Sequence, residues 1–372
     1  MATIYHLLDE AEVFSERHGG AVSRWAANVL REGREIVICP SYDSSWGFPA
    51  DRIYQMPHWS LTDPIHPLLY RLPWHLQTLS YRTIFRILLG KLQRGDTIYV
   101  HNRPESASVL ATVAPKLGVR IILHMHNSHL IRANRGQLGA LRNTPIVFCS
   151  EFLRTEAQNA LHNHFKKTYV VRNGADDSKY GFVERGQNST PTVIFTGRLV
   201  PYKGVHVLME AMRILERQGV GVKCKILGAS GFRKSRSTRY TRALERLRPG
   251  NTELLGYKVG HEIAEALQSA DIFCCPSTWN DPFPLAPLEA MATGLPVVAS
   301  GTGGLKEMLA FGGGILVPPK SPELLAQALR TVIVDLPFRR KLGAEARAAF
   351  TDHFLWTNVR VQYDQVLREV LA

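Results

Sequence analysis

The sequence lacks long apolar runs and the glycine pattern of common dinucleotide-binding enzymes. No stretch of its 372 residues approaches 18 consecutive apolar residues, so we predict no membrane-spanning helix. Near the N-terminus, Asp9 and Glu10 come before any apolar stretch long enough for a signal peptide. The absence of a G-x-G-x-x-G pattern argues against an NAD-dependent dehydrogenase or a sugar-nucleotide epimerase. We expect a cytoplasmic protein.

Cysteine is also scarce and is not arranged for metal binding or disulfides. There are five cysteines, an odd number, with no C-x-x-C spacing. Most lie inside apolar, strand-like runs, where a free thiol packs as a small hydrophobic group. We predict buried free thiols in a reducing compartment at positions Cys39, Cys149, Cys224, Cys274 and Cys275.

Positive charge, in contrast, is abundant. The chain has a formal net charge of +13, with 45% hydrophobic and 21% charged residues. Such a composition is typical of a globular protein with a sizeable core. The excess positive charge favours polyanionic partners, which include nucleic acid, anionic lipid headgroups and phosphorylated substrates. Composition alone does not choose among these partners.

Short β-branched runs alternate with helix-length segments in two successive halves. This alternation predicts a parallel sheet built from βαβ units in each half. Between the halves, residues 174–190 have the polar composition of an interdomain linker. We therefore predict two Rossmann-like domains. The expected strands are 3–8, 35–39, 97–101, 120–125, 145–150 and 168–173 in the first half, and 192–197, 222–228, 252–256, 271–277, 296–300 and 314–319 in the second.

Two acidic residues flank a predicted helix start in residues 280–300. A strand ending at Cys275 runs into a loop, and a helix begins near Pro287 and stops at Gly294. Ligands of doubly wound folds bind at the carboxyl ends of strands, where helix N-termini favour phosphate. Asp281 and Glu289, eight residues apart, can then reach a sugar and a ribose. Alternatively, they are a turn residue and a surface carboxylate.

This segment resembles the acidic-x7-acidic motif of retaining glycosyltransferases of family 4, which have the GT-B fold. The resemblance implies that Asp281 contacts the transferred sugar, that Glu289 binds the ribose, and that backbone amides in the loop 283–286 hold the diphosphate. Asp281 departs from the usual glutamate, which leaves the donor sugar open. Pro284 has no N–H to donate. The expected diphosphate contacts are therefore at Phe283, Leu285 and Ala286, with the amides of the last two as donors.

A second match, G-R-x4-K-G at residues 197–204, supplies two cations. Arg198 and Lys203 follow a strand and can bracket a diphosphate. In the family such a pair stabilises the charge that develops on the departing nucleoside diphosphate. The other interpretation is two solvated loop cations. No two aspartates have the Asp-x-Asp spacing by which other glycosyltransferases hold a metal. We therefore expect no metal and no cofactor.

In the first half, two glycines and a histidine match the family. Gly19 and Gly20 stand at a strand-to-helix turn, where the family's glycine-rich loop lies over the donor phosphates; a plain turn is the alternative. Alternation places His124 and His126 on one side of a strand that ends near Met125. The resemblance implies that His126 contacts the donor sugar, while His124 packs in the strand. A zinc site from these two and His129 lacks a fourth ligand.

Smaller matches complete the predicted donor site. Gly228 closes a strand, backbone groups of Tyr257 and Lys258 lie where the family reads the base, and Glu307 follows Gly-Gly in a loop near the sugar. Glu307 could also cap its own helix. The pattern of residues 354–371 predicts an amphipathic helix. In GT-B proteins the C-terminal helix returns to the first domain, and the resemblance implies the same here.

A basic segment remains outside these motifs. Residues 65–94 interleave five arginines and lysines with leucine and aromatic residues and contain no acid. Such a helix suits an anionic bilayer surface, so we expect the first domain to dock peripherally on the inner face of the membrane; a core-packing helix is the alternative. Neither this run nor the basic run 232–248 belongs to a nucleic-acid module, and we expect no nucleic-acid partner.

Together these features predict an α/β protein of GT-B architecture with two facing Rossmann-like domains. Residues 1–175 form the acceptor domain, residues 176–355 the nucleotide-sugar donor domain, and residues 356–372 a helix that packs back on the first. The expected activity is metal-independent, retaining hexosyl transfer from a UDP-sugar, or secondly from GDP-mannose, to a glycan, glycolipid or small molecule. The remaining alternative is an inactive, membrane-associated relative that binds nucleotide sugars.

Overall fold

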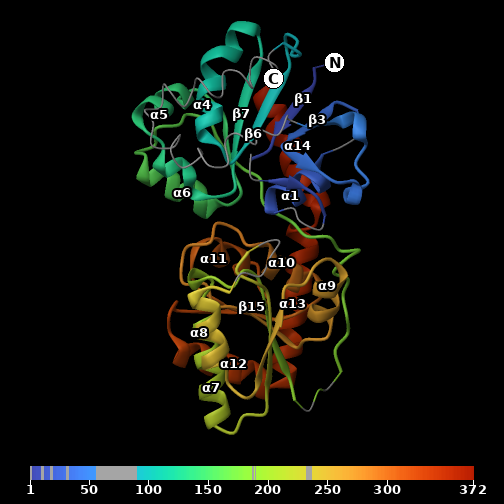
Figure 1. Cartoon of the computed structure of the whole chain (residues 1–372), viewed down its shortest axis with the longest axis vertical. Coiled ribbons are helices and arrows are strands. Elements are labelled where there is room, and N and C mark those ends of the chain that lie inside the picture. The colour runs from blue at the N-terminus through green and yellow to red at the C-terminus, as the bar shows by residue number, and fades with distance from the viewer. Residues whose placement is uncertain are drawn as a thin grey trace. The chain divides into compact units, whose positions relative to one another are not determined.

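The chain forms two compact α/β units. The computed structural model describes residues 2–9, 12–16, 20–30, 33–55, 90–186, 188, 190–231 and 237–372. The first unit comprises Met1–Val171 and Arg360–Ala372, and the second comprises Arg172–Val359 (Figure 1).

A seven-stranded parallel sheet forms the centre of the first unit. Its strand order is β5-β3-β1-β6-β7-β8-β9, and every neighbouring pair is parallel. The order reverses between β1 and β6, because the chain first builds outward through β3 and β5 and then returns to the other side of β1. The strands are Ile4–Leu7 (β1), Glu35–Cys39 (β3), Ile53–Gln55 (β5), Thr97–His101 (β6), Arg120–Met125 (β7), Ile146–Phe148 (β8) and Thr168–Val170 (β9).

All six strand segments predicted for this half contain a strand of the sheet. The prediction missed the edge strand β5 and a separate pair, β2 (Val13–Phe14) with β4 (Ser41–Tyr42). These strands have two or three residues each, too few to show a period along the sequence. The described helices are α1 (Ala21–Val29), α4 (Pro104–Val113), α5 (Arg135–Leu141) and α6 (Glu151–Ala160).

The second unit has a six-stranded parallel sheet in the order β12-β11-β10-β13-β14-β15. Here the order reverses between β10 and β13. The large core beside this sheet includes the buried apolar residues of α7. The strands are Thr192–Thr196 (β10), Lys223–Leu227 (β11), Thr252–Gly256 (β12), Ile272–Cys275 (β13), Val297–Ser300 (β14) and Gly314–Val317 (β15). The helices are Val205–Arg217 (α7), Arg239–Leu247 (α8), His261–Gln268 (α9), Leu285–Ala292 (α10), Gly303–Leu309 (α11), Pro322–Val334 (α12) and Leu336–His353 (α13).

The polar segment 174–190, predicted as a linker, is instead attached to the second unit over its described residues. Tyr180 is only 3% exposed. The Arg185 guanidinium donates to the carbonyl oxygens of Ala270 at 2.7 Å and Thr293 at 2.6 Å. Asp177 forms an ion pair with Arg347 of α13. Its polar side chains therefore bind the domain surface, and polar composition alone was a poor guide to a free linker.

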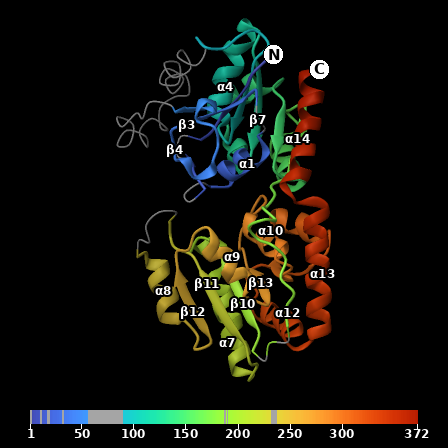
Figure 2. The same ribbon diagram turned by 90° about the vertical axis from the view of Figure 1, so that its right-hand side faces the viewer.

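The last helix, α14 (Trp356–Leu371), begins in the second unit and continues into the first. Val359 and Tyr363 on this helix are fully buried. Arg360 donates to the carbonyl oxygen of Val29 and pairs with the carboxylate of Glu35 on β3 at 3.1 Å. The expected return of the C-terminal helix to the first domain is thus confirmed, and α14 can be followed alongside that domain in Figure 2.

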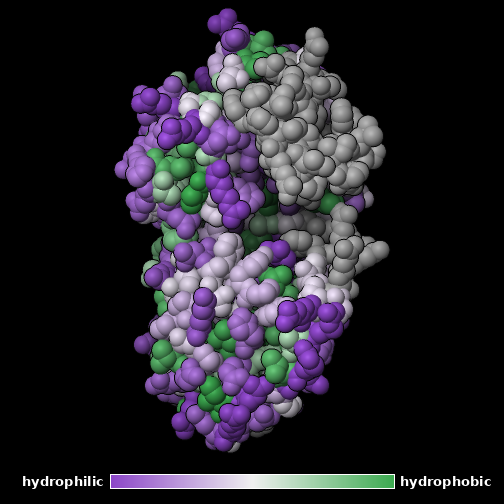
Figure 3. Space-filling view, turned by 60° about the vertical axis from the view of Figure 1, so that its left-hand side comes forward, coloured by the Kyte–Doolittle hydropathy of each residue, from purple (hydrophilic) through white to green (hydrophobic). Residues whose placement is uncertain are grey.

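The predicted free thiols are confirmed, because all five cysteines are buried and unpaired with one another. Burial raises the pKa of the Cys39 and Cys224 thiols to about 12. Among the described residues, no helix combines the length and the apolar content needed to cross a bilayer. Most of the basic segment 65–94 lies outside the described residues. On the face of the second unit drawn in Figure 3, hydrophobic residues form small separate groups among hydrophilic ones.

Candidate functional site

The candidate site of the second unit lies where the strand order reverses, between β10 and β13. Loops that leave the carboxyl ends of two such strands diverge to opposite faces of the sheet and leave a crevice between them, which is where doubly wound folds bind ligands. The loop after β10 carries Arg198 and Lys203, and the loop after β13 carries Asp281. The topology therefore brings the two predicted motifs to the same edge of the sheet.

A glycine lets the two loops approach each other closely. Lys203 ends a short 3₁₀ helix, and Gly204 follows it with a φ of 74° in the left-handed region. A Cβ atom at Gly204 would lie 1.8 Å from the carbonyl oxygen of Pro276, just beyond β13. The glycine of the G-R-x4-K-G match thus has a steric function, since it fixes the position of Lys203 beside the second loop.

Lys203 and Asp281 form an ion pair between their Nζ and Oδ2 atoms. Both side chains are largely buried, with 20% and 9% of their surfaces exposed. The Asp281 loop rests on the start of α11, where the Gly304 N–H donates to the Asp281 carbonyl oxygen at 2.8 Å. A Cβ atom at Gly304 would lie 1.9 Å from the carbonyl oxygen of Pro282. A side chain on Gly304 would therefore push the Asp281 loop away.

Arg198 is positioned by an aromatic residue that the sequence analysis did not single out. Its guanidinium contacts the Tyr202 hydroxyl and lies 5.6 Å from the centre of the Tyr202 ring. The Tyr202 ring packs edge-on against Trp279 at 5.2 Å, and the Tyr202 carbonyl oxygen accepts from the Thr278 N–H at 2.9 Å. Tyr202 thus links the loops after β10 and β13. The sequence feature that could have identified Tyr202 is its position directly before Lys203.

Helix α10 carries the second acidic residue of the motif. The helix begins at Leu285, two residues before the predicted Pro287, so Leu285 and Ala286 supply first-turn amides, which have no acceptor within a helix. Glu289 is 5% exposed, and one of its carboxylate oxygens accepts from the Tyr180 hydroxyl at 3.0 Å. Glu289 is therefore not a solvated surface carboxylate.

Phe283 has a packing contact that a ligand-binding role does not explain. Its side chain is 4% exposed and lies 5.8 Å from the Phe354 ring, centre to centre. Its carbonyl oxygen accepts from the Asn173 side-chain amide at 2.9 Å. These contacts anchor the loop between Asp281 and α10. Asn173 is therefore part of the support for this loop.

The remaining predicted residues of the second unit have structural contacts. A Cβ atom at Gly228 would lie 1.8 Å from the Gly197 carbonyl oxygen, so Gly228 permits close packing of the loops after β10 and β11. Lys258 pairs with Glu262 at 2.9 Å, and Tyr257 beside it is 38% exposed. Glu307 on α11 pairs with Arg172 at 2.8 Å, which differs from the capping role considered for it.

In the first unit, the N-terminus of α1 already binds a carboxylate of the chain itself. One oxygen of Glu12 accepts from the N–H groups of Gly20 at 2.8 Å and Ser23 at 3.0 Å. Burial raises the Glu12 pKa, and these N–H groups oppose that rise. The amide of Gly20, at the turn that resembles the family's glycine-rich loop, is thus bound to Glu12. Gly19 lies outside the described residues.

His126 lies at the edge of a cluster of buried rings. The rings of His124 and His126 are on the same side of β7, 4.0 Å apart, as the alternation predicted. His124 is fully buried, and its Nδ1 lies 3.2 Å from the Tyr99 hydroxyl. The expected packing role of His124 is thereby confirmed. The backbone N–H of His126 donates to Oδ1 of Asn102 at 2.6 Å.

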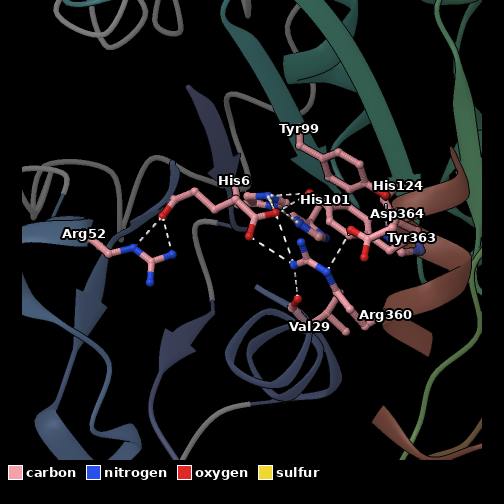
Figure 4. Close-up of polar contacts among 10 residues, drawn as sticks. His6, Val29, Arg52, Tyr99, His101, His124, Arg360, Tyr363 and Asp364 are labelled. Atoms are coloured by element: carbon pink, nitrogen blue, oxygen red, sulfur yellow. Dashed lines mark hydrogen bonds and ion pairs between the residues drawn. The ribbon is translucent and has the colours of Figure 1, made fainter. Parts of the chain in front are cut away.

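His101, at the end of the neighbouring strand β6, completes this cluster and had not been singled out. Ring nitrogens of His101, His124 and His126 lie within 4.8 Å of one another, and within the described ranges these form the sole group of three side chains suited to a metal. His129 is not a member, so the trio considered from the sequence does not form. His6, His101, His124 and Tyr99 can be followed in Figure 4.

Comparison with protein families identifies the second unit. The family described as "Glycosyl transferases group 1" matches residues 178–349. The chain belongs to the group 1 glycosyltransferases. The matched region of this glycosyltransferase contains Arg198, Lys203, Asp281 and Glu289, whereas His126 lies outside it.

Curated relatives and a solved structure extend the likeness into the first domain. The glycosyltransferase is 25% identical to spore coat protein SA of Bacillus subtilis over 292 residues, 72% of this chain and 77% of that protein. It is 31% identical to the D-inositol 3-phosphate glycosyltransferase of Corynebacterium aurimucosum over 281 residues, 67% of this chain and 66% of that protein. Its fold is similar to that of HepE of Anabaena, solved in complex with UDP-glucose, with a TM-score of 0.71, 19% identity, and coverage of 98% of this chain and 99% of that one. The fold is therefore GT-B.

Proposed function

We propose that this glycosyltransferase transfers a hexosyl unit from a UDP-sugar to an acceptor hydroxyl, with retention of anomeric configuration and without a metal ion. The observation that carries the proposal is the contact of Lys203 with Asp281 at the reversal of strand order, with Arg198 on the same loop as Lys203. A cation and an acid at a ligand-binding edge of the sheet suit a ligand that is anionic at one end and rich in hydroxyls at the other.

In this proposal, the charges of the site are redistributed when the donor binds. Lys203 turns from Asp281 to the diphosphate, which Arg198 and the first-turn amides of α10 also bind. Asp281 is then free to accept a hydrogen bond from a hydroxyl of the transferred sugar. Glu289 accepts from the ribose hydroxyls, and backbone groups at Tyr257 and Lys258 contact the base.

Transfer then depends on stabilising the departing nucleoside diphosphate. The bond from its oxygen to the anomeric carbon breaks, and the electron pair stays on the phosphate, where Arg198 and Lys203 offset the developing charge. The acceptor hydroxyl attacks the same face of the sugar and gives its proton to the departing phosphate. This scheme uses no protein nucleophile. His126 contacts the donor sugar near the reacting carbon.

A protein of similar fold suggests the nucleotide that carries the donor sugar. The UDP-glucose complex of HepE supports UDP as the carrier, with GDP-mannose as the second choice. The acceptor is a glycan, a glycolipid or a small molecule. We further propose that the protein acts in the cytoplasm and that the basic segment 65–94 docks on anionic membrane. No nucleic-acid partner is proposed.

Thermal stabilisation by nucleotides tests the donor site directly. The purified protein is heated with UDP, GDP, ADP or NAD, each with and without EDTA. We expect UDP to raise the melting temperature most and EDTA to leave that shift unchanged, because a ligand that binds only the folded state stabilises it. A shift by NAD alone, or one abolished by EDTA, would contradict the proposal.

Product analysis separates catalysis from binding. The protein is incubated with UDP-glucose and other UDP-sugars plus a panel of acceptors, and NMR determines the anomeric configuration of any product. A product with the configuration of the donor supports retention, and an inverted product rejects it. UDP binding without UDP release from any donor and acceptor pair would instead favour an inactive, binding-only relative.

A further inference from the structure

A continuous chain of hydrogen-bonded side chains runs through the core of the first domain to His126. It begins at the carboxylate of Glu35 on β3. It continues through three residues that Figure 4 labels, which are Tyr363 on α14, His6 on β1 and His101 on β6. The successive distances are 2.9 Å from the Tyr363 hydroxyl to Glu35, 3.1 Å from that hydroxyl to His6 Nε2, 3.2 Å from His6 Nδ1 to His101 Nε2, and 3.2 Å from His101 Nδ1 to His126 Nε2.

The carboxylate end of this chain carries a negative charge. Arg360 pairs with Glu35 at 3.1 Å, and a guanidinium stays protonated at every physiological pH. Arg360 also pairs with Asp364 one turn further along α14, at 2.9 Å. A carboxylate held by arginine is an acceptor only, so the hydrogen between Glu35 and Tyr363 must come from the tyrosine hydroxyl.

The three rings between Glu35 and His126 are uncharged, so each of them carries one proton on its polar atoms. Burial lowers the pKa of His6 to about 4 and holds the pKa of His101 well below the usual histidine value. Burial likewise holds the pKa of Tyr363 well above that of a free tyrosine. At neutral pH, each of these two histidines therefore has one N–H donor and one bare nitrogen, and Tyr363 keeps its hydroxyl proton.

These conditions leave a single direction for all the hydrogen bonds. Tyr363 donates to Glu35, so its oxygen accepts from His6 Nε2–H. The bare Nδ1 of His6 then accepts from His101 Nε2–H. His101 Nδ1 is bare in turn and accepts from His126 Nε2–H. A reversal at any step would place two bare acceptors, or two protons, in the same contact.

We propose that this chain of hydrogen bonds holds a proton on Nε2 of His126 and so keeps the ring in one orientation beside the end of β7. His6, His101 and Tyr363 are thus positioning residues for transfer. The inference rests on the proposed function, because that proposal gives His126 its role in sugar binding. The inference accounts for an otherwise costly burial of polar rings, because each group in the chain is satisfied by the next.

Isotope-edited NMR tests for the proton on Nε2 without any need for activity. In protein labelled with ¹⁵N-histidine, a protonated nitrogen and a bare one in the same ring have well-separated shifts, and His126→Gln assigns the signal of His126. We expect a protonated Nε2. In Tyr363→Phe the chain loses its orientation, and we expect the two His126 shifts to approach each other. Glu35→Gln removes the anion at similar volume and gives a second test.

Tyr99→Phe is the matched control. It removes an equally buried tyrosine hydroxyl, which contacts His124, a residue outside the chain of hydrogen bonds from Glu35 to His126. It should leave the His126 signals in place. With an active donor and acceptor pair, Tyr363→Phe should lower kcat about five- to tenfold, the effect of one hydrogen bond, while UDP binding is unchanged.

A bare Nε2 of His126 in the wild type would overturn the inference. So would a Tyr363→Phe protein with unchanged His126 shifts. If no donor and acceptor pair reacts, the proposed function fails, yet the NMR result still decides whether Nε2 carries a proton.

Discussion

In the second domain, Lys203 and Asp281 carry opposite charges and touch where the strand order reverses between β10 and β13. In the first domain, His6 and His101 lie on β1 and β6, the two strands between which that sheet reverses, and burial keeps both rings uncharged. Both domains thus place polar groups at the reversal of a doubly wound sheet. They differ in how each group is satisfied.

This difference indicates two kinds of site. An ion pair can exchange its partners for those of an ionic ligand, because the charges and hydroxyls of the ligand replace the contact that is lost. A chain of buried neutral groups cannot reorganise link by link, since each broken link leaves an unsatisfied polar group in the core. The second domain is therefore suited to bind charge, and the first to hold a fixed pattern of protons.

The largest effect is expected from removing the lysine of the ion pair. Lys203→Ala should lower kcat/KM about 100- to 1000-fold, because the departing diphosphate loses one preorganised cation. Steady-state kinetics with the active UDP-sugar measures this loss, and circular dichroism checks the fold. The control is Lys341→Ala, whose side chain is 71% exposed on α13 of the same domain. If both variants keep near wild-type activity, Lys203 is not part of the catalytic site.

The steric role of Gly204 predicts the next effect. Gly204→Ala should destabilise the second domain by about 2 to 4 kcal/mol, because two effects add. The alanine backbone is strained in the left-handed conformation, and its Cβ atom would clash with the Pro276 carbonyl oxygen. Gly219 has a similar φ of 69°, and a Cβ atom there would have nothing within 4 Å. Gly219→Ala should therefore lower the free energy of unfolding only by the backbone strain of the left-handed conformation, about 1 kcal/mol. Urea unfolding measures both. UDP should still stabilise Gly219→Ala but not Gly204→Ala, and equal losses would contradict this role.

How far the sequence predicts these sites depends on the separation of their residues. Parallel strands end at one edge of a sheet, so the loops with Arg198, Lys203 and Asp281 could be assigned to that edge before their contacts were known. The hydrogen-bonded chain in the first domain could not, because His6 and His101 are 95 residues apart and Tyr363 is 357 residues from His6. Strand order and the path of α14 bring them together, and neither leaves a local pattern.

Local composition also does not tell, in two places, which polar groups are already bound. The segment 174–190 is polar like a linker, yet Arg185 uses its polarity to bind backbone carbonyl oxygens of the second domain. Gly20 opens a helix like a phosphate loop, yet Glu12, eight residues earlier, already binds its N–H. In both cases the partner was another part of the chain, and only the folded structure shows which groups are already satisfied.

The neutral rings of the first domain predict a pH effect that the second domain should not share to the same extent. The folded-state pKa of His6 is about 4, below the unfolded value of about 6.5, so the unfolded chain binds more protons between these values. Stability is therefore lost as the pH falls from 6.5 toward 4, by about 2 kcal/mol at pH 5 from His6 alone. His101 and His124 shift in the same direction.

Hydrogen exchange measured by mass spectrometry follows each domain separately. After correction for the intrinsic exchange rates, protection of β1, β6 and β7 should decrease between pH 7 and pH 5 more than protection of β10, β13 and β14. An equal decrease in both sheets would mean that the buried histidines do not set the acid sensitivity of the first domain.

The smallest effect concerns the partner of Glu289. Tyr180→Phe removes the hydroxyl that donates to this carboxylate, so Glu289 is held less firmly for the ribose. KM for the donor should rise about two- to tenfold, as expected for one hydrogen bond, while kcat stays the same because the contact is equal in the ground and transition states. Tyr240→Phe, which removes a hydroxyl bonded to His206, is the control and should leave both constants unchanged. A fall in kcat with constant KM would instead place Glu289 in the chemical step, beside Lys203 and Asp281 of the same domain.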